Sequence, residues 1–235
     1  MDTALFLGFA AAYSVLLLWG FALAARTRWW TPANLPLLVV AALVYDNLVL
    51  GSGRWIGEGA LLEAVNYARF YVHAAITPLL VAWALHTLRR AGFAWAQARW
   101  YQVASIGAAL ALTFVEFLLE VRGLKLAPRE EFGVLSYTGT EPPSGPPLMV
   151  LIVAAVLLVA GALLWKRRGW PWLFAGALVM TIGSGVRLPI DSGAVTNAFE
   201  LTLLISIVAT KAYQDGDDRS VDNRPAASRI TTFRR

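Results

Sequence analysis

Seven long apolar stretches occupy most of this 235-residue chain and constrain its fold more than any other feature. A helix of about 17–25 apolar residues crosses a hydrocarbon core of about 30 Å. Backbone polar groups inside lipid must bond within their own segment, which favours helices over an open sheet. The stretches lie near 3–25, 35–52, 58–88, 100–121, 147–165, 170–187 and 194–213. We therefore predict an all-α integral membrane protein, a bundle of seven transmembrane helices within residues 1–213.

Composition supports a membrane location. Apolar residues make up 58% of the chain and charged residues 15%, against about 25% charged in a soluble domain. The absence of cysteine excludes disulfides, thiol nucleophiles and cysteine-ligated metals. The net charge of +5 lies in short loops and the tail, so it indicates orientation in the bilayer rather than a nucleic-acid partner. We expect an integral protein of a prokaryotic plasma membrane.

Basic residues concentrate in alternate loops and so predict the orientation. The loops near 26–28, 89–99 and 166–168 are basic, whereas the intervening loops carry both signs. Because positive loops stay cytoplasmic, the N-terminus is expected outside and the C-terminus inside. The outer loop 122–146, rich in proline towards its end, is expected to be a stiff, extended connector. The polar segment 214–235 has little to bury and is expected to be a disordered cytoplasmic tail.

Polar residues within the apolar stretches gather towards the outer side. They are Asp46, Asn47, Glu63, Asn66, Arg69, Tyr71, His73, Glu116, Glu120, Arg187, Asn197 and Glu200. A charge that faces lipid costs roughly 2.5–3.5 kcal/mol on insertion scales, so these side chains are expected to face one another. The sequence predicts a polar pocket in the outer half of the bilayer, lined by the second, third, fourth, sixth and seventh helices. The first and fifth helices, which are almost purely apolar, are expected to be peripheral.

A first hypothesis is a membrane-embedded enzyme or binding protein that acts on a lipid-like or amphiphilic substrate. His73 is expected to be its acid–base group, oriented by Glu63, Glu116 or Glu200. Arg69 and Arg187 are expected to hold an anionic head group, because arginine offers a planar fork of donors. The remaining substrate-binding residues are expected to be Asp46, Asn47, Asn66, Tyr71 and Asn197. The expected partners are membrane lipids and a small-molecule or lipid substrate.

Several alternatives use the same residues. Pairing Arg69 with Glu63 or Glu200 would simply lock two helices together. Acids outnumber bases in the cluster, and surplus carboxylates in a low dielectric stay protonated or bind a cation. A divalent metal site suited to zinc, iron or manganese would draw on Asp46, Glu63, His73, Glu116 and Glu200. The runner-up function is a transporter of protons, cations or small solutes, and a third is a membrane sensor.

Two Gly-Ser-Gly sequences, at 51–53 and 183–185, suggest an internal repeat. Each leads into a helix in which an asparagine is followed three residues later by a charged residue. These residues are Asn66 with Arg69 and Asn197 with Glu200. The pattern predicts a 3+1+3 arrangement with the fourth helix as linker, as parallel repeats occur in some transporters. Pro78, within the third stretch, predicts a kink beside His73.

Overall fold

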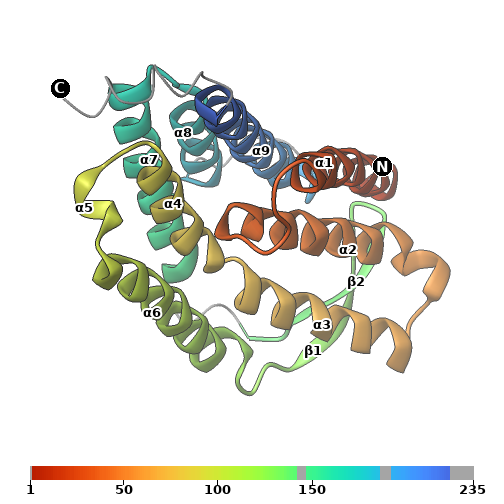
Figure 1. The fold of residues 1–235 in the computed structure, drawn as a ribbon. Helices are drawn as coiled ribbons and strands as arrows, with labels where there is room; N and C mark the ends of the chain where they lie inside the picture. Colours follow the sequence, from red (N-terminus) through yellow and green to blue (C-terminus); the bar gives the residue numbers. More distant parts are fainter. Residues whose placement is uncertain (1, 142–146, 186–191, 223–235) are drawn as a thin grey trace.

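The computed structural model describes residues 2–141, 147–185 and 192–222 (Figure 1). These residues are mostly helical, with one small β-hairpin. The elements are α1 (Asp2–Ala25), η1 (Pro32–Asn34), α2 (Leu35–Ile56), α3 (Ala60–Ile76), α4 (Leu79–Arg90), α5 (Ala94–Gln97), α6 (Arg99–Glu116), η2 (Phe117–Val121), β1 (Leu126–Glu131), β2 (Val134–Gly139), α7 (Leu148–Arg168), α8 (Trp172–Gly185) and α9 (Val195–Asp222).

Within the described residues, six helical segments are long and apolar enough to cross a membrane. They are Asp2–Ala25, Pro32–Ile56, Ala60–Arg90, Arg99–Val121, Leu148–Arg168 and Val195–Arg219. The described part of α8 is apolar but shorter, and residues 186–191 after it lie outside the description. Large apolar side chains such as Leu18, Val103 and Val159 are exposed on the outside of the bundle, as in a protein surrounded by lipid. The fold therefore fits an all-α membrane protein.

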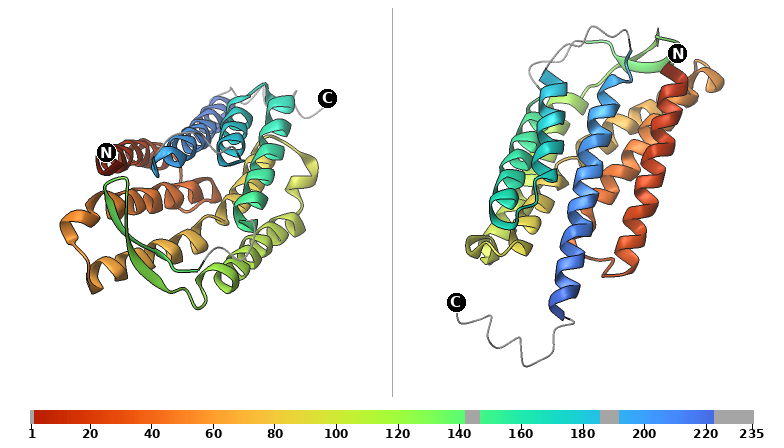
Figure 2. Two further views of the ribbon diagram at one scale, coloured as in Figure 1. Left: turned by 180° about the vertical axis from the view of Figure 1, so that it is seen from behind. Right: turned by 90° about the horizontal axis from the view of Figure 1, so that it is seen from above.

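The long helices run back and forth between two ends of the molecule (Figure 2). We call one the hairpin end, since it holds β1, β2, the start of α1 and the α2–α3 turn. We call the other the tail end, since it holds α5, the α7–α8 turn and the C-terminal part of α9. Around the bundle, α1 packs against α2 and α9, α8 packs between α7 and α9, and α4 packs against α6 and α7.

The third apolar stretch is broken where the sequence predicts a kink. α3 ends at Ile76, and α4 begins at Leu79 after Thr77 and Pro78. Proline has no backbone N–H to donate and its ring clashes with the preceding turn. The break turns α4 towards α6 and α7, so that the third stretch contributes to two neighbouring walls of the bundle.

The loop after η2 forms an antiparallel hairpin instead of the expected extended connector. β1 and β2 pair from Leu126 with Gly139 to Glu131 with Val134. Phe132 and Gly133 both have positive φ, as two-residue hairpin turns of type I′ require. The turn docks on the start of α1, where the Thr3 hydroxyl donates to the Gly133 carbonyl at 2.7 Å. The proline-rich residues 142–146 lie outside the description.

Glycine allows two close helix contacts. A Cβ added at Gly161 of α7 would lie 2.6 Å from Phe174 Cα of α8. One added at Gly176 of α8 would lie 2.2 Å from the Ser206 hydroxyl of α9. Small residues of this kind let helix backbones approach within a membrane, so α7, α8 and α9 form one tightly packed unit.

α9 continues past the predicted boundary at Gln214 to Asp222, so the expectation of disorder from residue 214 onward is wrong for 214–222. Asp215 accepts from Lys211 Nζ at 2.6 Å and from an Arg90 terminal nitrogen at 2.8 Å. The Gln214 side chain donates to the Thr87 carbonyl at 2.9 Å. The bonds of Gln214 and Asp215 to residues of α4 thus stabilise the additional turns of the helix. Residues 223–235 lie outside the description.

The first and fifth helices, expected to be peripheral, each bury one face against their neighbours. Tyr13 of α1 and Leu157 of α7 are fully buried. The most exposed long helix is α6, in which Ala109 is the single buried residue of the described helix. An apolar helix packs as well against other helices as against lipid, so low polarity does not indicate a peripheral position. Its polar residues Gln102, Ser105, Thr113 and Glu116 are nevertheless only partly exposed.

Candidate functional site

A cavity of about 610 Å³ lies between α2, α3, α4, α6, α7 and α9. Its ionisable and amide side chains are Asp46, Arg69, His73, Glu116, Glu120, Asn197 and Glu200. The rest of its lining is chiefly apolar and includes Val39, Leu43, Leu80, Val153, Leu157 and Leu203. We call this space the polar cavity. It brings together side chains from helices that are far apart in the sequence.

An ion pair between α2 and α3 forms one wall of the polar cavity. Arg69 Nε donates to Asp46 Oδ1 at 2.7 Å, and Arg69 Nη1 donates to Asn66 Oδ1 at 2.8 Å. Asn66 is fully buried and lies one helical turn before Arg69. The alternative in which Arg69 pairs with Glu63 or Glu200 is therefore wrong, because its partner is Asp46. Asp46 holds the Nε side of the guanidinium and Asn66 a terminal nitrogen, which fixes the orientation of Arg69.

A second hydrogen-bond network joins α1, α2 and α9. Asn47 Nδ2 donates to Asn197 Oδ1 at 2.8 Å and to the Leu43 carbonyl at 2.9 Å. The Tyr13 hydroxyl donates to the Asn197 backbone carbonyl at 3.0 Å. Asn47 is fully buried and does not line the cavity. It positions Asn197, which does, and Tyr13 is a supporting residue that sequence reasoning missed because a lone tyrosine in an apolar helix gives no signal.

His73 and Glu200 face the polar cavity from opposite sides of the bundle. His73 Nδ1 lies 3.4 Å from the Thr77 hydroxyl, which is at the break between α3 and α4. His73 interacts electrostatically with Asp46 and Arg69, and Glu200 with Asp46 and Tyr13. Glu200 makes no hydrogen bond or ion pair with a described residue. Its carboxyl group is therefore available, within the described structure, to a ligand in the cavity.

Glu116 and Glu120 complete the polar lining from the hairpin-end part of α6. Glu116 ends α6, and Glu120 lies in the following π-helical turn, η2. Such turns are rare and occur frequently at functional sites. Glu120 lines the cavity with Glu116, so it faces the other polar residues as the sequence predicts. The sequence predicts the depth of these carboxyl groups but carries no signal for the π-turn.

Other predicted site residues lie outside the cavity lining. Glu63 is on α3 nearer to the hairpin end and is absent from the lining. Tyr71 is 45% exposed, and its ring packs edge-on against Phe117 with the centroids 5.5 Å apart. Asn47 and Asn66 do not line the cavity, but they form hydrogen bonds with Asn197 and Arg69, which do. Arg187 lies outside the described residues.

The proposed metal ligands do not converge. Within the parts of the chain that the structure describes, no three His, Asp or Glu side chains lie close enough together to hold a metal ion. Asp46 is instead engaged by Arg69, and Glu63 lies outside the cavity. The chemistry that the arrangement offers is hydrogen bonding, charge and proton exchange by His73 and the carboxyl groups.

No protein-family model matches the chain, and no curated protein matches it significantly. The functional argument therefore depends on the fold and on the geometry of the polar cavity.

Proposed function

We propose that this chain is a seven-span membrane protein, with its hairpin end outside and its tail end cytoplasmic, that binds an amphiphile in the polar cavity. It acts as a membrane-embedded binding protein or as an enzyme on that amphiphile. The observation that carries the proposal is one cavity with an apolar lining and a cluster of polar side chains. Ligand cavities in proteins are mostly apolar, with a few placed polar groups, and occupy about 300–1,000 Å³.

The lining suggests where each part of the ligand would lie. Leu43, Leu80, Leu157 and Leu203 offer apolar contacts to a hydrocarbon chain. Each methylene group buried in such a lining contributes about 0.8 kcal/mol. The head group would lie beside His73, Glu116, Glu120 and Glu200, which leaves the chain to occupy the apolar part.

The charges of the described lining favour a head group that donates hydrogen bonds or carries positive charge. Arg69 is already held by Asp46 and Asn66. The remaining described groups are His73 and the carboxyl groups of Glu116, Glu120 and Glu200. This revises the expectation of an anionic head group, as far as the described residues are concerned. An amine or a polyol is the better match.

In an enzyme of this kind, His73 would exchange the proton. Its ring faces the cavity, and the Thr77 hydroxyl lies beside Nδ1. General acid–base catalysis needs such a group within hydrogen-bond reach of the reacting atom. The carboxyl groups of Glu116 and Glu200 would orient the substrate or stabilise charge that develops on it.

Thermal unfolding of the purified chain with matched amphiphiles tests the proposal. The probes are a long-chain primary amine, the corresponding alcohol and the corresponding carboxylic acid. A ligand at about 100 times its Kd adds about 2.7 kcal/mol to the free energy of unfolding. We expect the amine or the alcohol to stabilise the wild type more than the acid does. His73→Ala and Glu200→Gln should weaken this effect, whereas the control Glu63→Gln should keep it. Equal stabilisation by all three probes, or none, would refute the proposal.

Transport is a second candidate, favoured by the packing of the helices. The first three membrane stretches (α1, α2 and α3 with α4) can be matched in order with the last three (α7, α8 and α9). The contact of α1 with α9 then corresponds to the contact of α7 with α4. This correspondence supports a 3+1+3 repeat.

Proteoliposomes that enclose a pH-sensitive dye test transport of protons. Under an imposed gradient, we expect the wild type to collapse it faster than protein-free vesicles and Glu200→Gln to lose that activity. Glu63→Gln serves as the control with an acid outside the cavity. A wild-type rate equal to that of empty vesicles would eliminate proton transport and leave amphiphile binding unaffected.

A further inference from the structure

A second cavity of about 620 Å³ lies in the tail-side half of the bundle, between α2, α4 and α6. We call it the tail-side groove and define it by Trp29, Leu38, Leu79, His86, Arg89 and Gln102. It belongs neither to the polar cavity nor to the function proposed for it. Among the residues that define the groove, only Leu38 and Leu79 are sequence neighbours of residues that line the polar cavity, namely Val39 and Leu80.

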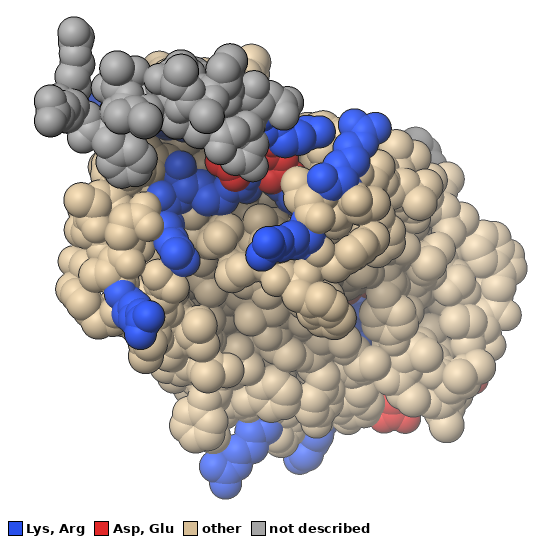
Figure 3. All heavy atoms as spheres, viewed as in Figure 1, with Lys and Arg blue, Asp and Glu red and all other residues tan. Residues whose placement is uncertain are grey.

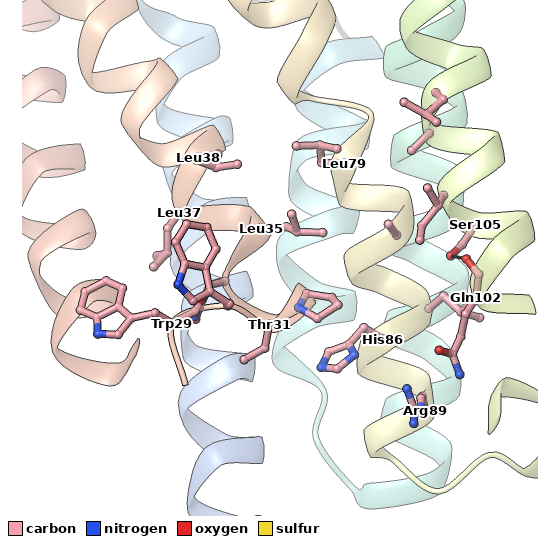
Figure 4. A pocket seen from close by; sticks show the side chains of 18 of the residues that line it. Trp29, Thr31, Leu35, Leu37, Leu38, Leu79, His86, Arg89, Gln102 and Ser105 are labelled. Atoms are coloured by element: carbon pink, nitrogen blue, oxygen red, sulfur yellow. Dashed lines mark hydrogen bonds between the residues drawn. The ribbon is translucent and has the colours of Figure 1, made fainter. Parts of the chain in front are cut away.

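The groove is amphipathic along its length (Figure 4). Leu37, Leu38 and Leu79 lie towards the middle of the bundle, whereas His86 and Arg89 lie towards the tail end. This order matches a lipid of the tail-side leaflet, whose chains point to the middle of the bilayer and whose head group lies at the surface.

Arg89 has donors left for an anion at the mouth of the groove. Its Nε donates to Gln97 Oε1 at 3.2 Å, and Gln97 donates back to the Arg89 carbonyl at 2.8 Å. These bonds hold the side chain in place, while its two terminal nitrogens make no hydrogen bond to a described residue. A guanidinium binds phosphate strongly through such paired N–H groups.

The surroundings of the groove also favour an anionic lipid. Figure 3, viewed from the tail end, shows several Lys and Arg side chains around the face and fewer acidic ones. Trp29 and Trp30, which line the groove, are 53% and 100% exposed. Tryptophan is enriched at membrane–water interfaces, and basic residues there attract anionic lipids.

We infer that the tail-side groove is a binding site for an anionic phospholipid, with an acyl chain along Leu38 and Leu79 and the phosphate at Arg89. Neither the polar cavity nor its ligand is needed for this site. The two proposals therefore fail independently.

Electron paramagnetic resonance of the full chain in phosphatidylcholine vesicles tests the inference. The probes are phosphatidylglycerol and phosphatidylcholine, each spin-labelled at the same acyl position. We expect the wild type to immobilise the phosphatidylglycerol probe preferentially. Arg89→Gln should reduce that preference about fivefold, the effect of removing one basic residue from an anionic surface. The control Arg99→Gln removes an exposed arginine that does not line the groove and should keep most of the preference.

A second pair of variants tests the apolar part. Leu38→Trp should fill the groove and release both probes, whereas Leu48→Trp, at a similarly exposed position of α2 outside both cavities, should not. Unchanged immobilisation in Leu38→Trp, or an unchanged preference in Arg89→Gln, would overturn the inference. So would a disulfide-linked dimer of Ile106→Cys in vesicles, because the chain has no other cysteine and the dimer would show that a second copy covers the groove.

Discussion

At the residue scale, charges inside the bundle are paired or gathered around one cavity. The side chains of Arg69 and Asp46 are 15% and 27% exposed, so the pair lies partly out of water. The sequence predicts the depth of both residues and the face of α3 that carries Arg69. It could not predict Asp46 as the partner, because that depends on the rotation of α2 relative to α3. The sequence places Glu63 and Glu200 at the same depth as Arg69, so the polar pattern was equally compatible with either of them as its partner.

Removal of the Asp46 charge should destabilise the protein. In Asp46→Asn, Arg69 keeps Asn66 but loses its counter-charge, and we expect a loss of about 2 kcal/mol in the free energy of unfolding, less than for a fully buried pair. Denaturant unfolding in detergent measures the change. The exposed pair Arg54–Glu130 provides the control, since Glu130→Gln should cost less than about 1 kcal/mol. Equal effects in the two variants would contradict a special role for Asp46.

At the element scale, the mostly helical fold and the break at Pro78 are confirmed, and six of the seven predicted stretches, all but the sixth, correspond to helices long and apolar enough to cross a membrane. Apolar length and proline are strong local signals. The hairpin, the π-turn η2 and the extension of α9 were not predicted. Each depends on contacts with distant residues, such as the docking of Gly133 on Thr3 or of Gln214 on Thr87.

The extension of α9 should depend on Asp215. The side chains of Lys211 and Asp215 are 3% and 4% exposed, and Arg90 binds the same carboxylate. Asp215→Asn leaves two buried cations without their shared counter-charge and should cost about 3 kcal/mol. Asp218, which also binds Arg90 but is 62% exposed, is the matched control. Circular dichroism with thermal unfolding should show a much smaller loss for Asp218→Asn.

The contact between α7 and α8 should tolerate no side chain at Gly161. Gly161→Ala places a methyl group 2.6 Å from Phe174 Cα, so the helices must separate, and overpacking of this kind costs about 1–3 kcal/mol. Gly8→Ala in α1 is the control, because nothing lies within 4 Å of its added Cβ. We expect a lower melting temperature for the first variant and an equal or higher one for the second. A Gly161→Ala protein as stable as wild type would show that the two helices can move apart freely.

At the scale of the whole molecule, the alternation of basic loops predicts which segments share an end. The structure places the turns after α1, α4 and α7 together with the end of α9, as that alternation requires. It also shows what the sequence could not: which helices are neighbours. Hydrophobicity gives the length and depth of each helix, whereas the order around the bundle depends on side-chain shape.

The predicted orientation can be measured with single cysteines, since the chain has none of its own. Thr140→Cys lies at the hairpin end and Ala94→Cys at the tail end, and both positions are exposed. In intact cells, a membrane-impermeant maleimide should label the first variant and leave the second unlabelled until the membrane is permeabilised. The reverse pattern would invert the topology, and labelling of both in intact cells would show that the segment Arg99–Val121 between them does not cross the membrane.

The length of α9 has a mechanical consequence. Its 28 residues form one uninterrupted helix, roughly 42 Å long at about 1.5 Å per residue. Asn197 and Glu200 lie near its N-terminal end. Asp215 and Asp217, which form ion pairs with Arg90 and Arg168, lie near its C-terminal end. Because the helix is continuous, a tilt imposed at Glu200 would also move its C-terminal part. The ion pairs of Arg90 and Arg168 would then be strained, and the surface at the tail end would change.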